Sequence, residues 1–401
     1  MNHTITFLRL ATLTAAVFTS AGVAIPAPVP QDAVTSPNAI IAETRGPLRS
    51  CAKLSLNVPP IEMAKHLTPV NFALGDSQHF YWCVSGIRDD NDGTFHLFAA
   101  RWPNAPRMAG WHENGELVHF TAKKAEGPYT EAGILLDNTT LPQGQHSVHN
   151  VRVDRFDNTY SIVYIVQTRP GREGQSIAQL TSNSLNGPWK LTNGDGILLR
   201  REDAKGHNRP DIEFSSCGVN NPDIVRLPNG KYCLYFKHAH LITHNGKPRS
   251  ITRYSTALAD TLTGPYTITA KQATDNPLNI EDAEAFVYKD TPYLLTTDNF
   301  GSVTGLKGAC ILWPSYDGGL TFRSKNARLA VGHFSDYIVP PKRVTYPYSR
   351  EDKFERPSLL FIGGEPKYFI APTGINILRH TGTHSLILRI ETPDPFADSH
   401  P

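Results

Sequence analysis

The chain has 401 residues, and its 39 basic residues nearly balance 37 acidic ones, leaving a formal net charge of +2. A charge so close to neutral argues against a broad basic surface for nucleic acid or for an anionic membrane. With 18 Phe, 15 Tyr, 30 Gly and 31 Pro, the composition favours many short strands joined by turns over a helical bundle.

The first 24 residues have the pattern of a secretory signal peptide. Arg9 is the only early charge, and the apolar run that follows ends in small residues that suit cleavage after Ala24. The run is too short and too rich in Ala, Thr and Ser to span a bilayer comfortably, although an uncleaved anchor is the alternative. We therefore predict a secreted or periplasmic protein with a signal peptide at residues 1–24, a proline-rich linker at 25–50 and no membrane partner.

Five cysteines are spread along the sequence. None forms a Cys-x-x-Cys pair, so no zinc site is predicted. In an oxidising compartment one or two disulfides are possible, and the odd number leaves at least one thiol unpaired.

A hairpin pattern recurs five times along the rest of the sequence. Each copy begins with a pair of polar or aromatic residues, continues as a short alternating strand, and returns after a turn as a second strand rich in aromatic and β-branched residues. The pairs begin at Trp82, His149, Asn220, Glu281 and Glu355, at intervals of 67, 71, 61 and 74 residues. Such intervals are too long for a solenoid repeat and fit a four-stranded antiparallel unit with variable loops.

Turn motifs between the hairpins repeat as well. They are "EGPYT" at Glu126, "NGPWK" at Asn186 and "TGPYT" at Thr263, and "SYDGGLTF" at Ser315 resembles the Asp-box turn of sialidase propellers. Five such units in a ring make an all-β fold, a five-bladed β-propeller of four-stranded antiparallel blades, which we predict for residues 51–401. We expect "LTPVNFALGD", residues 67–76, to help close the ring; a pair of β-sandwiches is the alternative.

The first strand of each blade in a propeller lines the central channel, so the five strand starts should meet at one mouth. This places two adjacent acids, Glu281 and Asp282, beside the other pairs, and Arg152, Asp223 and Glu284 follow two steps along. The residues expected to bind a substrate at this mouth are Trp82, Arg101, His149, Asn150, Asn221, Glu355 and Arg356.

Carboxylates, amides, a histidine and a tryptophan together suit a sugar. Crowded acids raise one another's pKa, so that one can stay protonated while its neighbour is ionised, as acid–base hydrolysis of a glycosidic bond requires. Each residue also has a structural interpretation: the acids could cap strands, His149 and Trp82 could be packed residues, and Glu355 could pair with Arg356.

The strand starts resemble the five-bladed propeller superfamily of glycoside hydrolases, which includes families 32, 43, 62, 68 and 117. The resemblance covers roughly residues 76–385 and depends on "NNPD" at Asn220, "EDA" at Glu281 and "ERP" at Glu355. Families 32 and 43 carry a general-acid Glu two residues ahead of a Pro in a blade-start motif. The resemblance implies this role for Glu281, although Ala283 replaces the Pro.

The sequence also departs from that pattern. The families use an Asp of an early blade as base or nucleophile and another as a pKa modulator, whereas the matching positions here are Cys83, Asn150 and Asn221. Asp223, Asp282 or Glu355 would have to serve instead.

The prediction is therefore a secreted, inverting glycosidase that degrades a poly- or oligosaccharide, with Glu281, Asp223 and Asp282 as catalytic residues. No cofactor is expected to be required, although the channel could hold a Ca²⁺ ion. The alternatives are a carbohydrate-binding propeller without catalysis and a polysaccharide lyase that uses His149 and Arg356.

Overall fold

A computed structural model describes residues 58–76, 78–103, 107–169, 174–202, 212–213, 219–244, 246–277, 279–337, 354–373 and 383–399. All of them belong to one compact unit, Thr35–Pro401. The predicted signal peptide and linker lie outside the described residues, as do Cys51 and Cys217.

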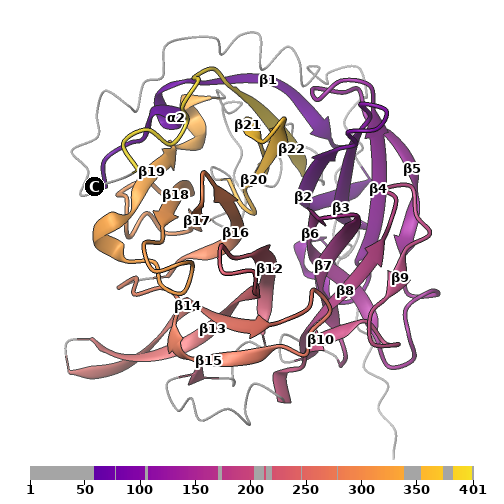
Figure 1. Cartoon of the computed structure of the whole chain (residues 1–401), viewed down its shortest axis with the longest axis horizontal. Helices are drawn as coiled ribbons and strands as arrows, with labels where there is room; N and C mark the ends of the chain where they lie inside the picture. The colour runs from indigo at the N-terminus through magenta and orange to yellow at the C-terminus, as the bar shows by residue number, and fades with distance from the viewer. Residues whose placement is uncertain are drawn as a thin grey trace, which may run out of the picture. The chain divides into compact units, whose positions relative to one another are not determined.

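The described strands form five antiparallel sheets that surround a central axis (Figure 1). The first blade contains β2 (His79–Arg88), β3 (Phe95–Pro103), β4 (Glu116–Ala122) and β5 (Thr130–Leu136). The second contains β6 (His146–Phe156), β7 (Thr159–Gln167), β8 (Gln175–Ser182), β9 (Lys190–Leu191) and β10 (Ile197–Leu199). The third contains β11 (Ile212–Glu213), β12 (Asn220–Arg226), β13 (Tyr232–His244), β14 (Lys247–Ala259) and β15 (Thr267–Gln272).

The last two blades complete the ring and confirm the predicted fold. The fourth blade contains β16 (Glu281–Tyr288), β17 (Thr291–Asp298), β18 (Ala309–Pro314) and β19 (Arg328–Val331). The fifth contains β20 (Ser358–Ile362), β21 (Glu365–Thr373), β22 (His384–Ile390) and β1 (Leu67–Leu74). Short helices α2 (Glu62–Lys65), η2 (Arg107–His112), η4 (Ser324–Asn326) and η5 (Phe334–Asp336) lie in the segments outside the strands.

The N-terminal strand closes the ring, as predicted from "LTPVNFALGD". Strand β1 pairs antiparallel with β22, with Leu67 opposite Ile390 and Phe72 opposite Leu386. The first and last described strands thus share one blade, so that opening the ring would expose the edge of β22.

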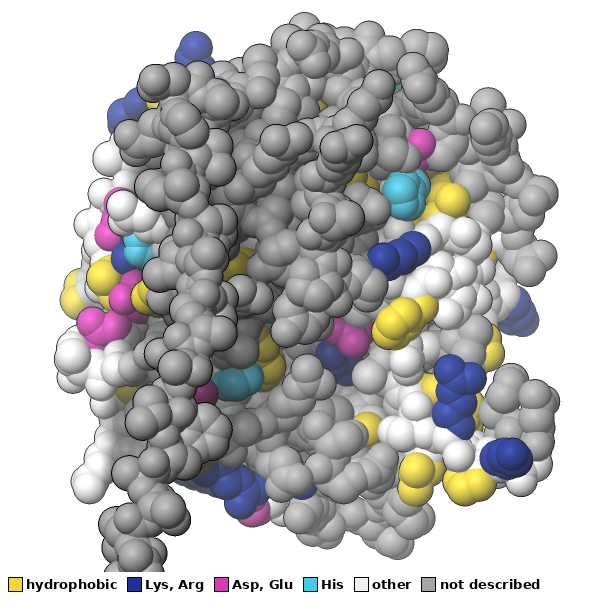
Figure 2. All heavy atoms as spheres, turned by 180° about the vertical axis from the view of Figure 1, so that it is seen from behind, with side chains coloured by type: hydrophobic (Ala, Val, Ile, Leu, Met, Phe, Trp, Pro, Cys, Tyr) yellow, Lys and Arg dark blue, Asp and Glu magenta, His cyan; other side chains and the backbone are white. Residues whose placement is uncertain are grey.

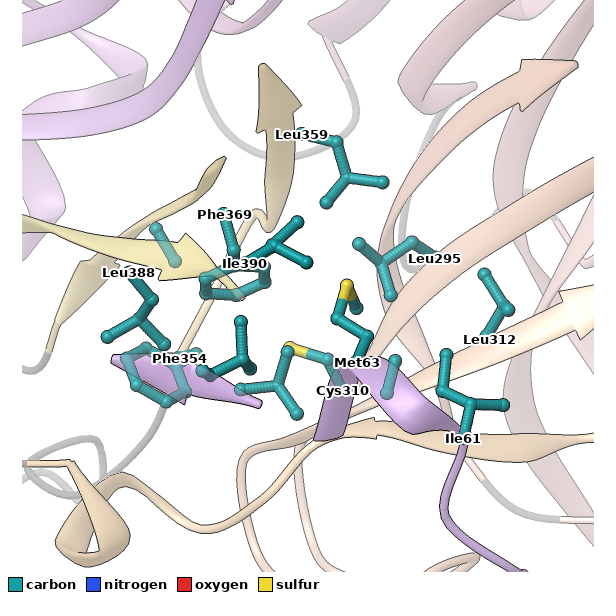
Figure 3. Packing of buried hydrophobic residues seen from close by; sticks show 14 of the residues in the cluster. Ile61, Met63, Leu295, Cys310, Leu312, Phe354, Leu359, Phe369, Leu388 and Ile390 are labelled. Atoms are coloured by element: carbon teal, nitrogen blue, oxygen red, sulfur yellow. The ribbon is translucent and has the colours of Figure 1, made fainter. Parts of the chain in front are cut away.

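The helix before β1 seals the contact between the fourth and fifth blades. Ile61 and Met63 are fully buried in a hydrophobic cluster that also contains Leu312 of β18 and Leu388 of β22 (Figure 3). This cluster joins the two ends of the described sequence in one hydrophobic core, which the area-proportional hydrophobic effect stabilises.

The repeated turn motifs lie where the sequence placed them, between the third and fourth strands of a blade. The Gly-Pro bonds at 127–128, 187–188 and 264–265 are all cis, and each glycine has a positive φ. Tyr129 and Tyr266 fold back to donate hydrogen bonds to the carbonyls of Ala125 and Leu262.

The five strand-start pairs share an unusual backbone. The second residue of each pair has a φ between 48° and 64°, in the left-handed region that few residues other than glycine adopt. These residues are Cys83, Asn150, Asn221, Asp282 and Arg356. In β2, β6, β12 and β16 the strand register shifts at the same place, which marks a bulge. A bulge re-aims side chains, so both members of a pair can face the same mouth of the channel despite strand alternation.

Side-chain hydrogen bonds join the inner strands of adjacent blades. The accepting side chain follows the first residue of a strand-start pair by three positions. Ser85 accepts a hydrogen bond from the backbone N–H of Val153 at 3.1 Å. Asp223 accepts one from Ala285 at 2.7 Å, and Glu284 accepts one from Leu359 at 2.7 Å. Each bond runs from one blade to the next, so these buried acceptors hold neighbouring blades in register.

Candidate active site

The floor of the site is a row of hydrogen-bonded side chains contributed by successive blades. The Cys83 thiol donates to Asn150 Oδ1 at 2.6 Å, Asn150 Nδ2 donates to Asn221 Oδ1, and Asn221 Nδ2 donates to Asp282 Oδ1 at 2.8 Å. The backbone N–H of Arg356 donates to the other oxygen of Asp282 at 3.3 Å. The residue with a positive φ in every blade therefore takes part, and together these residues form one connected layer across the channel below the mouth.

Above this floor lies a cavity of about 270 Å³. Its lining residues are Trp82, Trp111, His149, Asn150, Gln175, Asn220, Asn221, Lys237, Ala239, Ser250, Ile251, Thr252, Asn279, Glu281, Asp282 and Glu355. The structure thus brings together seven of the ten predicted site residues, from four different blades and the segment before β20. The volume is close to the lower end of the roughly 300–1,000 Å³ typical of ligand pockets.

Three carboxyl groups meet in this cavity. Burial, together with the negative charges of Glu281 and Glu355, raises the pKa of Asp282 to about 6, although the positive charges of Arg356 and Lys237 oppose the rise. Glu281 lies 3.2 Å from the Lys237 ammonium, measured from Oε2 to Nζ. Lys237 and Glu281 thus form an ion pair inside the cavity, since opposite charges at this distance attract each other.

One wall of the cavity is aromatic. The His149 ring centroid lies 4.9 Å from that of Trp111 and 5.4 Å from that of Trp102, in tilted arrangements. Trp82 also lines the cavity, is 3% exposed and packs against the ring of Trp102. Such a wall offers flat apolar surface next to polar groups, as a sugar ring requires.

Amide groups line another part of the cavity. Asn220 Nδ2 donates to Gln175 Oε1 at 2.8 Å, and the Asn220 carbonyl oxygen Oδ1 is buried with no hydrogen-bond partner in the protein. A buried acceptor left without a donor costs free energy, so this oxygen is ready to accept a hydrogen bond from a hydroxyl group of a bound molecule.

Three predicted site residues lie outside the cavity. Asp223 is 1% exposed and lies in the channel beyond the floor, where it receives hydrogen bonds from the backbone of Ile224 and Ala285. Arg356 is completely buried and donates from Nη2 to the carbonyl of Asn150.

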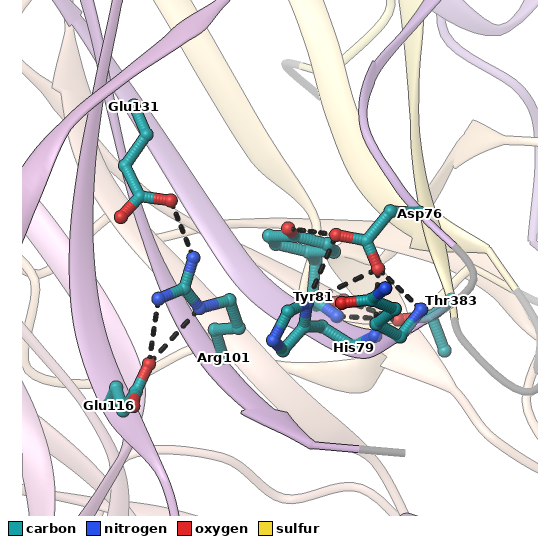
Figure 4. A network of polar contacts seen from close by, with 8 residues as sticks. Asp76, His79, Tyr81, Arg101, Glu116, Glu131 and Thr383 are labelled. Carbon is teal, nitrogen blue, oxygen red and sulfur yellow. Dashed lines mark hydrogen bonds and ion pairs between the residues drawn. The ribbon is translucent and has the colours of Figure 1, made fainter.

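Arg101, the third, lies on the outer part of the first blade. Its guanidinium pairs with Glu116 at 2.9 Å and with Glu131 at 2.6 Å (Figure 4). Both carboxylates come from β4 and β5, so the triad stabilises the blade itself and is not directed at the cavity.

Several lining residues were missed by the sequence analysis, above all Lys237 and Trp111. Lys237 comes from β13, the second strand of its blade, and Trp111 from η2, whereas the repeat pattern pointed only to first strands. Their residue types carry no motif that could have placed them in the cavity.

Among the residues that the structure describes, no group of three or more His, Cys, Asp or Glu side chains could hold a metal ion. Within the same residues, no helix is both long and apolar enough to cross a membrane.

Cys83, Cys233 and Cys310 are buried free thiols. On the face shown in Figure 2, the described Lys and Arg side chains stand at separate places and do not form one continuous basic surface.

Solved structures with similar folds include glycoside hydrolases. Zg3597, a family 117 glycoside hydrolase produced by the marine bacterium Zobellia galactanivorans, superposes with a TM-score of 0.57 at 13% identity, covering 84% of this protein and 94% of that one. CoXyl43, a family 43 β-xylosidase/α-arabinofuranosidase from a compost microbial metagenome, superposes with a TM-score of 0.50 at 14% identity, covering 82% and 96%.

The protein has the fold of five-bladed propeller glycoside hydrolases. BT0996, solved in an RGII complex, also superposes, with a TM-score of 0.56 at 11% identity over 85% of this protein and 93% of its own length. No family model matches the sequence, and no curated protein matches it either. The likeness is therefore one of fold, shared with several families and specific to none.

Proposed function

We propose that this propeller is a glycosidase that hydrolyses a glycosidic bond in the cavity above the channel floor. The observation that supports this most directly is the meeting of Glu281, Asp282 and Glu355 at one mouth, beside an aromatic wall and an unpaired amide oxygen. Two positioned carboxyl groups are the usual requirement of glycoside hydrolysis. Signal-directed export and breakdown of a polysaccharide remain part of the proposal.

Glu281 and Glu355 are the proposed catalytic pair. Glu281 is assigned as base or nucleophile because Lys237 stabilises its negative charge, which leaves Glu355 to protonate the departing oxygen. This reverses the role of Glu281 that the family resemblance implied. The oxygens of Asp282 already accept hydrogen bonds from Asn221 and from the backbone of Arg356. In this proposal the charge of Asp282 influences how readily Glu281 and Glu355 exchange protons.

The small cavity and its closed floor favour binding of a single sugar unit. In this proposal Trp82, Trp111 and His149 contact the face of the ring, while Asn220, Asn221 and Thr252 bind hydroxyl groups. Asp223, Arg356 and Arg101 have structural roles in the channel and the first blade.

The test is release of reducing sugar from a panel of plant and algal glycans. We expect new reducing ends from at least one glycan, without the ultraviolet absorbance that a lyase creates through its new double bond. Sugar binding in calorimetry without any release would contradict hydrolysis and favour a carbohydrate-binding propeller, which Cys83 in place of a first-blade acid would explain.

Lys237 should set the pH range of the activity. In Lys237→Met the long apolar part of the side chain is kept but the ammonium is lost, so Glu281 takes up a proton at higher pH. We expect the acidic limb of the kcat/KM profile to move upward by about one pH unit or more, because a unit charge at this distance is worth at least about 1 kcal/mol and about 1.4 kcal/mol corresponds to one pKa unit. Lys231→Met, on an exposed lysine paired with Asp260, is the matched control. An unchanged profile would remove Glu281 from the role of base.

A further inference from the structure

Two arginines cross the channel beneath the floor of the cavity. Arg152 of the second blade donates from Nη2 to the carbonyl of Ala283 in the fourth blade at 3.3 Å. Arg356, just before β20 of the fifth blade, donates from Nη2 to the carbonyl of Asn150 in the second blade at 3.3 Å. Neither pair of blades is adjacent in the ring, so both guanidinium groups must lie close to the axis.

The two guanidinium groups are buried and incompletely satisfied. Arg152 is 1% exposed and Arg356 is 0% exposed, and the Nε and Nη1 atoms of both have no hydrogen-bond partner in the protein. Among the described residues, Arg356 has no ion pair, and Arg152 has one long ion pair, with Asp223 at 3.8 Å from Nε. Because a buried hydrogen-bond donor that is left without an acceptor costs free energy, these N–H groups call for a further acceptor.

The acids that face the arginines do not supply this hydrogen-bond acceptor. They are Asp223 on β12, Asp282 and Glu284 on β16, and Asp154 on β6, and the first three already accept backbone or amide hydrogen bonds. Burial raises the pKa of Asp223 to about 6 and of Glu284 to about 7, and it raises that of Asp154 as well. Burial also raises the pKa of the Cys83 thiol, so this neighbour stays neutral.

We propose that the channel below the floor binds a small monovalent anion, chloride under ordinary conditions, between Arg152 and Arg356. The anion would accept from the Nε and Nη1 donors of both side chains and compensate two positive charges that otherwise repel each other. The site lies below the floor formed by Cys83, Asn150, Asn221 and Asp282, so it is separate from the proposed sugar site and does not depend on it.

The proposal includes a pH dependence with a definite sign. As the pH falls from 8 to 5.5, Asp223, Asp282 and Glu284 take up protons and lose negative charge, while the arginines keep their positive charge. Anion binding should therefore strengthen toward acid pH.

Two measurements on the wild-type protein test the site. Crystals grown in sodium bromide should show an anomalous peak within hydrogen-bonding distance of both guanidinium groups. The melting temperature should rise saturably by about 2 °C or more as bromide replaces gluconate at constant ionic strength, since a ligand that binds only the folded state stabilises it. The rise should be larger at pH 5.5 than at pH 8.

Arg356→Met supplies the control, because it keeps much of the side-chain volume and removes one charge. We expect its melting temperature not to respond saturably to bromide. If this variant does not fold, the two wild-type measurements still decide. A wild-type channel with no bromide between the arginines, or a melting temperature that is equal in bromide and gluconate, would overturn the proposal.

Discussion

Glu281→Gln and Glu355→Gln are each expected to lower kcat on the natural glycan by at least about a hundredfold, because a positioned proton-transfer group is worth roughly 10²–10⁴ in rate. Both variants keep the shape of the side chain but remove its negative charge and its ability to exchange a proton. The measurement is reducing-sugar release per folded molecule, with folding confirmed by the melting temperature.

An activated aryl glycoside of the same sugar separates the two roles. A phenolate with a low pKa departs without protonation, so Glu355→Gln should recover most of its activity on this substrate if Glu355 is the acid. Glu281→Gln should stay inactive on it, since the base or nucleophile is needed for every leaving group. The reverse pattern would restore Glu281 to the role of acid that the family resemblance implied.

Asp223→Asn is the matched control for these two variants. Asp223 is 1% exposed beyond the floor, and its oxygens hold Ile224 and Ala285 of two neighbouring blades. We expect a lower melting temperature and a largely retained turnover per folded molecule. A hundredfold loss of kcat with an unchanged melting temperature would return Asp223 to the catalytic set.

Phe72→Asp is expected to destabilise the whole propeller by more than about 4 kcal/mol, because it places an unpaired charge in a hydrophobic core. Phe72 is 9% exposed on β1, lies opposite Leu386 of β22 and packs edge-on against His384 at 5.7 Å. Since β1 closes the ring, losing its inner face should weaken the contact between the first and last described strands.

The free energy of unfolding, measured in urea, checks this prediction. Thr68→Ala on the same strand is the control, because Thr68 is only partly buried and bonds Glu391 at an exposed position, and it should stay within about 0.5 kcal/mol of wild type. Equal stability of Phe72→Asp and Thr68→Ala would show that the ring closes without the inner face of β1.

The sequence alone was enough to predict the propeller and to place seven of the ten candidate residues around one cavity. Five hairpins with paired polar starts, repeated turn motifs and the strand at residues 67–76 predicted the blades and their closure, because strands and tight turns are encoded by short local patterns. Propeller geometry then carried Trp82, His149, Glu281 and Glu355 to one mouth, since the first strand of each blade lines the channel.

Which charged groups are in contact depends on how the blades pack together. Lys237 and Glu281 are 44 residues apart in the sequence and meet only because two blades pack side by side. Asp223, which follows Asn220 by three residues, falls below the floor because a bulge with Asn221 in the left-handed region separates it from the mouth. Contacts between blades depend on bulges and on packing across the axis, and these follow from the whole ring and not from any local pattern.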